Sequence, residues 1–207
     1  IQTRLAQSQF QFGYNRNYER WQDESLSQTP LPSRGFGNLW TIFGNWNFQL
    51  NQHFGGRFQG TYGRGLVRNP PPAKGRETDY TIALFVKPID RLTVEPELDY
   101  ARITNLQDGS RYFNGYITRT RTQFQATKEL SMRLIVQYDD FYKSWDIDPL
   151  LTYRLSPFSV LYLGSAVNYS QLWYTRDTSD PLYPDPFSRW RTTSRQFFMK
   201  LQYLFQT

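Results

Sequence analysis

Residues 195–207 read RQFFMKLQYLFQT, and their side chains alternate between two chemical kinds. Positions 197, 199, 201, 203 and 205 are all apolar, whereas the positions between them include Lys200 and Gln202. Successive side chains of a β-strand point to opposite faces. The stretch therefore predicts a strand with one wholly apolar face that ends on an aromatic residue.

The same period of two recurs along most of the chain, and helical periodicity is nearly absent. The pattern predicts an all-β fold of about ten up-and-down strands. We expect them at 7–18, 38–50, 56–66, 79–87, 92–100, 115–126, 132–142, 145–155, 159–170 and 195–207. We interpret residues 1–207 as one domain, an antiparallel transmembrane β-barrel, either closed by these strands or part of a larger barrel.

The lengths of the connections alternate, which supports this interpretation. Long connections are expected at 19–36, 69–77, 105–110 and 172–190, and short turns around Gln52 and at 88–91, 127–130 and 156–158. The connection before Trp145 is short where a long one is due. Outer-membrane barrels have short periplasmic turns and longer external loops. An even number of strands also places both chain ends on the periplasmic side.

The composition excludes several classes of function. Cysteine is absent and His53 is the single histidine, so thiol chemistry and most zinc sites are excluded. The net charge is +6, but no Lys/Arg run is present, and we expect no nucleic-acid partner. The sequence contains no run of about 18 apolar residues, so it predicts no transmembrane helix. A mean hydropathy of −0.67 is compatible with barrel strands, which need only every second residue apolar.

The alternative fold is a soluble, aromatic-rich carbohydrate-binding β-protein such as a β-sandwich. The aromatic share of 18% suits both folds. The less apolar face of the expected strands is rich in charged and amide groups, which are costly in a sandwich core. The expected strands are also longer than the usual 5–6 residues of soluble proteins. Both features favour the membrane barrel.

Charged residues on the polar sides of three consecutive strands predict a luminal polar ladder. Its members are Glu95, Glu97, Asp99, Arg119, Arg121, Arg133 and Asp139. We expect Arg119 to lie level with Glu95 on one side and with Asp139 on the other. The ladder either fills a narrow barrel or forms a selectivity or substrate surface. Catalysis by Glu95 and Glu97 is disfavoured because flanking arginines hold both ionised, so we expect no enzyme.

The remaining chemistry lies in the last long connection and the C-terminus. Trp173, Tyr183 and Trp190 are candidate ligand contacts that could stack on sugars, but loop packing and interfacial anchoring are the favoured explanation. The aspartates of 177–187 suit Ca²⁺, but a simple exposed loop is favoured, and we expect no metal, cofactor or catalytic residue. The alternating Leu201, Tyr203 and Phe205 resemble the signal read by the outer-membrane assembly machinery, except that Gln206 and Thr207 follow the last aromatic.

Two internal runs and the C-terminal end resemble one known family. They are TIALFVKPIDRLTVEPELDYARI, TRTRTQFQATKELSMRLIVQYDD and RQFFMKLQYLF. The family consists of Bacteroidota-type proteins of unassigned function. Its members join a periplasmic domain similar to a family-nine carbohydrate-binding module to a C-terminal outer-membrane barrel. The resemblance covers the chain from about Gly37 and implies that it is the C-terminal barrel part of a longer protein.

The expected function is that of an outer-membrane barrel in a Gram-negative bacterium. It would serve as a membrane anchor or assembly component, or as a narrow channel, because ten strands leave little open lumen. A porin-like channel for anionic or sugar-like solutes is the alternative. The expected partners are outer-membrane lipid and lipopolysaccharide, the barrel assembly machinery and proteins of a membrane complex.

Overall fold

The computed structural model describes residues 7–22, 33–68, 72–174 and 187–203, and their regular structure is entirely β. The strands are β1 (Gln7–Gln22), β2 (Ser33–Asn51), β3 (Phe54–Val67), β4 (Ala73–Ile89), β5 (Leu92–Asn105), β6 (Arg111–Gln125), β7 (Leu130–Asp139), β8 (Ser144–Ser156), β9 (Ser159–Tyr174) and β10 (Phe187–Tyr203). Among the described residues, no helix is long and apolar enough to cross a membrane.

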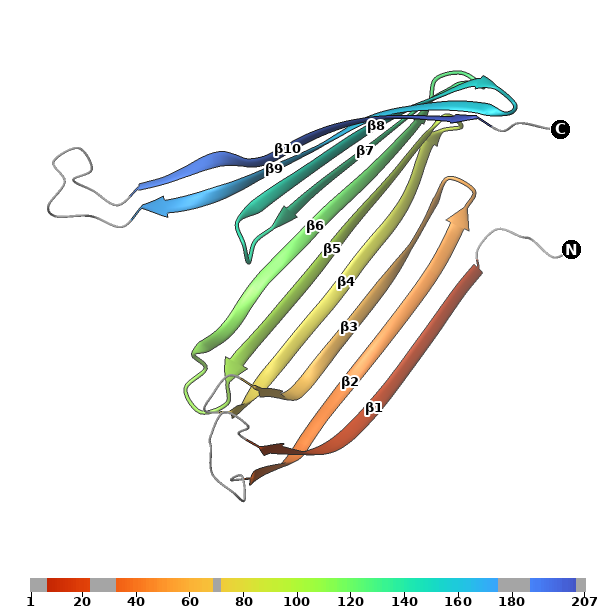
Figure 1. The fold of residues 1–207 in the computed structure, drawn as a ribbon. Coiled ribbons are helices and arrows are strands. Elements are labelled where there is room, and N and C mark those ends of the chain that lie inside the picture. Colours follow the sequence, from red (N-terminus) through yellow and green to blue (C-terminus); the bar gives the residue numbers. More distant parts are fainter. Residues whose placement is uncertain (1–6, 23–32, 69–71, 175–186, 204–207) are drawn as a thin grey trace, which may run out of the picture. The chain divides into compact units, whose positions relative to one another are not determined.

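The ten strands form one sheet in which each strand pairs with its neighbours in sequence (Figure 1). The order runs from β1 to β10 without a crossover, and the described pairs are antiparallel. The predicted all-β, ten-stranded, up-and-down fold is therefore confirmed. The order places β1 and β10 at its two ends, and no pairing between them occurs among the described strand pairs.

The chain divides into two compact units. The first contains Ile1–Ala83 and Leu98–Tyr116, and the second contains Leu84–Glu97 and Ile117–Thr207. The division falls within β4, β5 and β6.

The predicted alternation of connection lengths is present. Short connections occupy 52–53, 90–91, 126–129 and 157–158, and the other connections occupy 23–32, 68–72, 106–110, 140–143 and 175–186. The connection 140–143 is the predicted exception. Asp139, at the end of β7, accepts hydrogen bonds from the backbone N–H groups of Phe141 (2.8 Å) and Tyr142 (3.1 Å). Lys143 at the end of the connection adopts φ 48°. These features allow the strand to reverse with few residues.

In the first unit, cross-strand register gathers aromatic residues on one face of β1, β2 and β3. Tyr14 pairs with Ile42, which pairs with Tyr62, and Phe10 pairs with Trp46, which pairs with Phe58. The opposite face carries amides, because Gln11 pairs with Asn45 and Asn45 with Gln59. We call these surfaces the apolar face and the polar face of the first unit.

The second unit has the same two-sided chemistry. Its apolar face carries Met132, Leu134, Val136, Ile147, Leu151, Leu163, Val167, Met199 and Leu201. Its polar face carries Arg119, Arg121, Gln123, Arg133, Gln137, Asp146, Thr152, Asn168 and Lys200. Each set follows from the strand alternation and the printed register, and a slip by one residue would exchange the faces.

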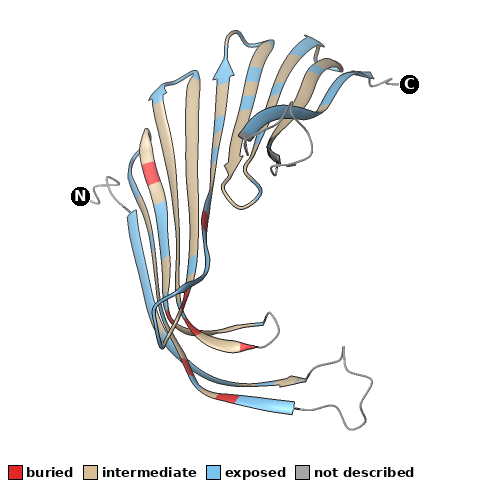
Figure 2. Ribbon diagram, turned by 90° about the vertical axis from the view of Figure 1, so that its left-hand side faces the viewer, coloured by how far each residue is buried: buried red, intermediate tan, exposed pale blue. Residues whose placement is uncertain are grey.

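The described residues do not bury a conventional hydrophobic core. Phe36 and Leu39 are the buried hydrophobic residues among them, each 3% exposed. Large apolar side chains are instead open to the surroundings, as for Phe10 at 69% and Met199 at 74%. Figure 2 shows that buried segments are few and short and that β1 is exposed along most of its length. A sheet built this way needs an apolar environment against its apolar face.

Aromatic rings on the polar faces lie over cross-strand glycines. Phe198 pairs with Gly164, and a Cβ atom at Gly164 would overlap the Phe198 ring. Phe43 and Gly13 repeat the arrangement in the first unit. In both pairs the missing side chain provides the space for the ring, which covers the glycine backbone.

We expect Gly164→Val to destabilise the folded protein by about 1–3 kcal/mol, because the Phe198 ring must leave its position. Ala166→Val is the matched control, since Ala166 lies on the same face of β9 and pairs with Gln196 instead of an aromatic residue. Urea unfolding in detergent micelles, followed by Trp fluorescence, measures both changes. Equal stability of the two variants would contradict the role assigned to the ring.

Candidate functional site

The polar face around β5, β6 and β7 is the candidate site, because most of the predicted ladder lies there. Arg121 forms an ion pair with Glu95, with the Arg121 Nε atom 3.7 Å from Glu95 Oε2. The two side chains are 45% and 39% exposed, so the pair is screened by its surroundings and contributes little by itself.

Gln123 extends this ion pair along β6. With its amide oxygen turned toward Arg121, it accepts hydrogen bonds from Nη2 (2.5 Å) and Nε (3.1 Å). Carboxylate, guanidinium and amide thus form a continuous polar chain across two strands. Gln123 was not among the predicted ladder residues, although the alternation places it on the same face as Arg121, two residues before it.

Threonine hydroxyl groups bond one carboxylate of the ladder and the backbone beside another. In the first unit, Thr81 Oγ1 donates to Asp99 Oδ1 at 2.6 Å. In the second unit, Thr118 Oγ1 donates to the Glu97 backbone carbonyl at 3.2 Å. In the first unit, Glu77 and Asp79 precede Thr81 at alternate positions of β4 and were missed as further carboxylates on the same side of that strand. The same alternation of polar residues in the sequence could have identified them.

The predicted levels of the ladder are displaced by one residue pair. Arg121, rather than Arg119, meets Glu95. On β7, Arg119 lies opposite Gln137, and Asp139 lies opposite Ile117. The expectation that Arg119 is level with Glu95 and Asp139 is therefore wrong. Asp139 instead stabilises the connection 140–143 through its hydrogen bonds to backbone N–H groups.

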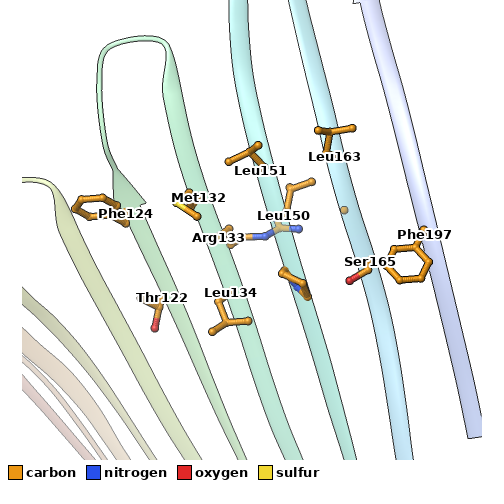
Figure 3. Close-up of a pocket in the computed structure, with 12 residues that line it drawn as sticks. Thr122, Phe124, Met132, Arg133, Leu134, Leu150, Leu151, Leu163, Ser165 and Phe197 are labelled. Atoms are coloured by element: carbon orange, nitrogen blue, oxygen red, sulfur yellow. The ribbon is translucent and has the colours of Figure 1, made fainter. Parts of the chain in front are cut away.

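Arg133 occupies the centre of the polar face in the second unit. It lies between Gln123 of β6 and Leu150 of β8, and in Figure 3 its side chain extends toward Leu150. Its Nε is buried and lacks a hydrogen-bond partner among the described residues. A buried, unpartnered guanidinium nitrogen is costly, and an anion or water supplies the missing acceptor most directly.

The apolar face of the second unit contains a shallow hollow of about 550 Å³ (Figure 3). Phe124, Met132, Leu151, Leu163 and Phe197 surround it, and the smaller Thr122, Pro149 and Ser165 leave the space. The lining is almost wholly apolar, so the hollow suits a hydrocarbon chain better than a polar solute.

Aromatic residues mark one end of this apolar face. The Tyr138 ring lies 4.8 Å from that of Trp145 and 6.4 Å from that of Trp190, centroid to centroid. Trp145 also pairs with Tyr169. Such rows of Trp and Tyr are typical of the interface between hydrocarbon and water.

The predicted loop contacts occupy different kinds of position. Trp190 lies within β10 opposite Gln171, and Trp173 lies within β9 opposite Ser188, so both belong to strands and not to a loop. The strands on both sides of this connection extend further than the sequence predicted. β10, for example, begins at Phe187. Tyr183 lies outside the described residues. Sugar stacking by these aromatics remains a prediction.

The predicted assembly signal lies on the end of β10. Leu201 pairs with Leu161, and Tyr203 pairs with Ser159. Both side chains are more than half exposed, at 62% and 58%. Phe205 lies outside the described residues. Among the described residues, no group of three or more His, Asp or Glu side chains has the arrangement needed to hold a metal ion.

No family model matches the sequence, and a search of curated proteins finds no match. The structure is similar to a crystal structure of a Pseudomonas aeruginosa FadL homologue, with a TM-score of 0.40 and 11% sequence identity. The similarity covers 96% of this chain and 63% of the other. The resemblance to the Bacteroidota-type family remains a prediction.

A double-mutant cycle of Glu95→Gln and Arg121→Gln should give a coupling free energy below about 1 kcal/mol, as for exposed ion pairs. The matched cycle of Glu97→Gln with Arg121→Gln should give a smaller value. Urea midpoints and slopes in detergent supply the free energies of unfolding. A coupling of several kcal/mol would overturn this expectation and mean that the pair is shielded from water.

Proposed function

We propose that this chain is the membrane-embedded part of an outer-membrane β-barrel that serves as an anchor or assembly component, or as a narrow channel. The observation that carries the proposal is the exposed apolar face of a single sheet whose other face is polar. Exposed apolar area in water costs about 25 cal/mol per Å². Lipid against the apolar face removes that cost.

The hydrogen bonding of the strands is compatible with this environment. A sheet spans hydrocarbon only when all backbone groups are paired, so the edges must be closed. The proposal therefore requires the outer edges of β1 and β10 to be paired, with each other or with further strands. The C-terminal residues Leu201 and Tyr203 would face lipid and present the pattern expected for the barrel assembly machinery.

The soluble carbohydrate-binding alternative has less support. A sandwich packs the apolar faces of two sheets about 10 Å apart. The described strands belong to one sheet, and large apolar residues in both units are exposed. Solubility without detergent would favour this alternative and contradict the membrane proposal.

A channel for anionic solutes is a second candidate, and the Arg133 side chain favours it. Its unpartnered Nε lies on the same face as Arg119 and Arg121. A basic surface lining a lumen attracts anions. Sugar-like solutes would also agree with the resemblance to the Bacteroidota-type family.

The membrane proposal predicts that Leu134→Arg blocks assembly. Leu134 is 40% exposed and lies opposite Pro149 and Thr122 in the middle of the apolar face. An arginine at the bilayer midplane costs about 2–4 kcal/mol. Gln137→Arg on the polar face of the same strand is the matched control and should assemble normally.

Heat-modifiability of the membrane fraction measures this assembly. The unboiled wild type and Gln137→Arg should migrate faster than the boiled protein on a gel, and Leu134→Arg should lose the fast band. Normal assembly of Leu134→Arg would sink the proposal that this face meets lipid.

Conductance in planar bilayers separates the anchor from the channel. The anchor predicts no steps. A channel selective for anions predicts steps whose anion preference falls in Arg133→Gln, since one lumen charge is removed. Steps with unchanged selectivity in that variant would contradict the role proposed for Arg133.

A further inference from the structure

Tyrosine and arginine recur two residues apart on three alternate strands of the first unit. The pairs are Tyr14 and Arg16 on β1, Tyr62 and Arg64 on β3, and Tyr100 and Arg102 on β5. Residues two apart on a strand share a face. Each arginine therefore accompanies its tyrosine on one side of the sheet.

Strand register shows that the first two pairs form continuous rows. Tyr14 lies opposite Ile42, and Ile42 lies opposite Tyr62. The next row joins Arg16 to Trp40 and Trp40 to Arg64. The Trp40 and Tyr62 rings are in contact, with centroids 6.1 Å apart. The two arginines thus flank a tryptophan at the end of the apolar face.

The third pair lies two strands further along the sheet, on β5. The Tyr100 ring stacks on Tyr80 of β4 with a centroid distance of 4.7 Å, and its hydroxyl donates to Asn114 of β6 at 2.7 Å. Ile103, the residue after Arg102, lies on the other side of the sheet, where a Cβ atom at Gly75 would contact it and lie 3.4 Å from Val67. The side chains of β5 therefore alternate regularly here, and Arg102 lies on the same face as Tyr100.

Along their strands, all three arginines lie beyond their tyrosines in the direction of the same rim of the sheet. Each is closer than its tyrosine to one of the connections 23–32, 68–72 and 106–110. In an outer-membrane barrel the longer connections are external. Tyrosine rings favour headgroup depth, so the arginines would lie about 7 Å further out, at the level of phosphates.

The arginines of this row are available to bind anions. Arg16 and Arg102 are exposed, and Arg64 is half-buried. Arg68 of this unit forms an ion pair with Glu19 at 3.0 Å. Among the residues described in this unit, no carboxylate lies within 4 Å of Arg16, Arg64 or Arg102. Arg16 and Arg64 lie in one row on alternate strands, so they are roughly 10 Å apart.

We propose that Arg16, Arg64 and Arg102 form a phosphate-binding row for lipopolysaccharide in the outer leaflet, an inference that rests on the proposed membrane function. Guanidinium groups bind phosphate oxygens through paired hydrogen bonds. Lipopolysaccharide carries several phosphates on one sugar headgroup and thus engages more than one arginine. The adjacent Tyr14, Trp40, Tyr62 and Tyr80 provide the apolar surface that its acyl chains require.

The test replaces the row in one variant, Arg16→Gln with Arg64→Gln and Arg102→Gln. The matched control, Arg57→Gln with Arg154→Gln and Lys200→Gln, removes three cations from the polar faces. Both proteins are purified in detergent, and binding of purified lipopolysaccharide is titrated at fixed salt. Each arginine near a charged surface contributes roughly a factor of five, so the row variant should bind on the order of 100-fold more weakly. The control should bind like the wild type.

Heat-modifiability of each protein is recorded first, so the two proposals fail separately. Absence of a fast-migrating band for the unboiled wild type contradicts the proposed membrane function. A folded row variant that binds lipopolysaccharide like the wild type overturns the phosphate row alone. Equal binding to phosphatidylglycerol vesicles or dephosphorylated lipopolysaccharide also overturns it. So does competition by millimolar inorganic phosphate, because the site would then serve a soluble anion.

Discussion

The structure depends on the alternation of side chains across a single hydrogen-bonded layer. Every central position of a strand belongs to one of two chemically distinct faces, and the register decides which neighbours it meets. A slip of one residue in any strand would transfer its apolar set to the polar face. Register shifts in the described pairs occur at Asn17/Glu19, Gln49/Asn51, Arg154/Ser156 and Thr192/Ser194. Two lie next to short turns and two toward the longer connections. Between these shifts the register aligns apolar residues across neighbouring strands, as in the row Val136, Ile147 and Val167.

Local signals were sufficient to predict the fold, because sequential antiparallel strands are encoded by local patterns. Apolar alternation identified ten strands, and turn residues identified the alternation of connection lengths. The ends of strands were less predictable. β10 begins at Phe187, where Pro184 and Pro186 nearby suggested a loop. The contact between Trp190 and Tyr138 joins residues far apart in sequence, and a local pattern cannot reveal it.

The candidate site was predictable in composition but not in register. The alternation placed Glu95, Arg121 and Arg133 on the polar face. Their partners depend on where each turn begins and ends, and the connection 126–129 places Gln125 opposite Ser131. This pairing brings Arg119 opposite Gln137, one pair away from the expected position. An error of two residues in a turn leaves every residue on its correct face, yet it changes every ion pair.

The strictly sequential strand order has a consequence for the growth and loss of the sheet. Because each strand pairs only with its chain neighbours, a hairpin can be inserted or deleted without altering the topology of the others. A pair of strands preserves the direction of every following strand, and the longer connections stay on their own rim. A single strand would reverse all that follow. The β-hairpin is therefore the smallest step by which such a sheet can change its width during evolution without reversing the strands that follow.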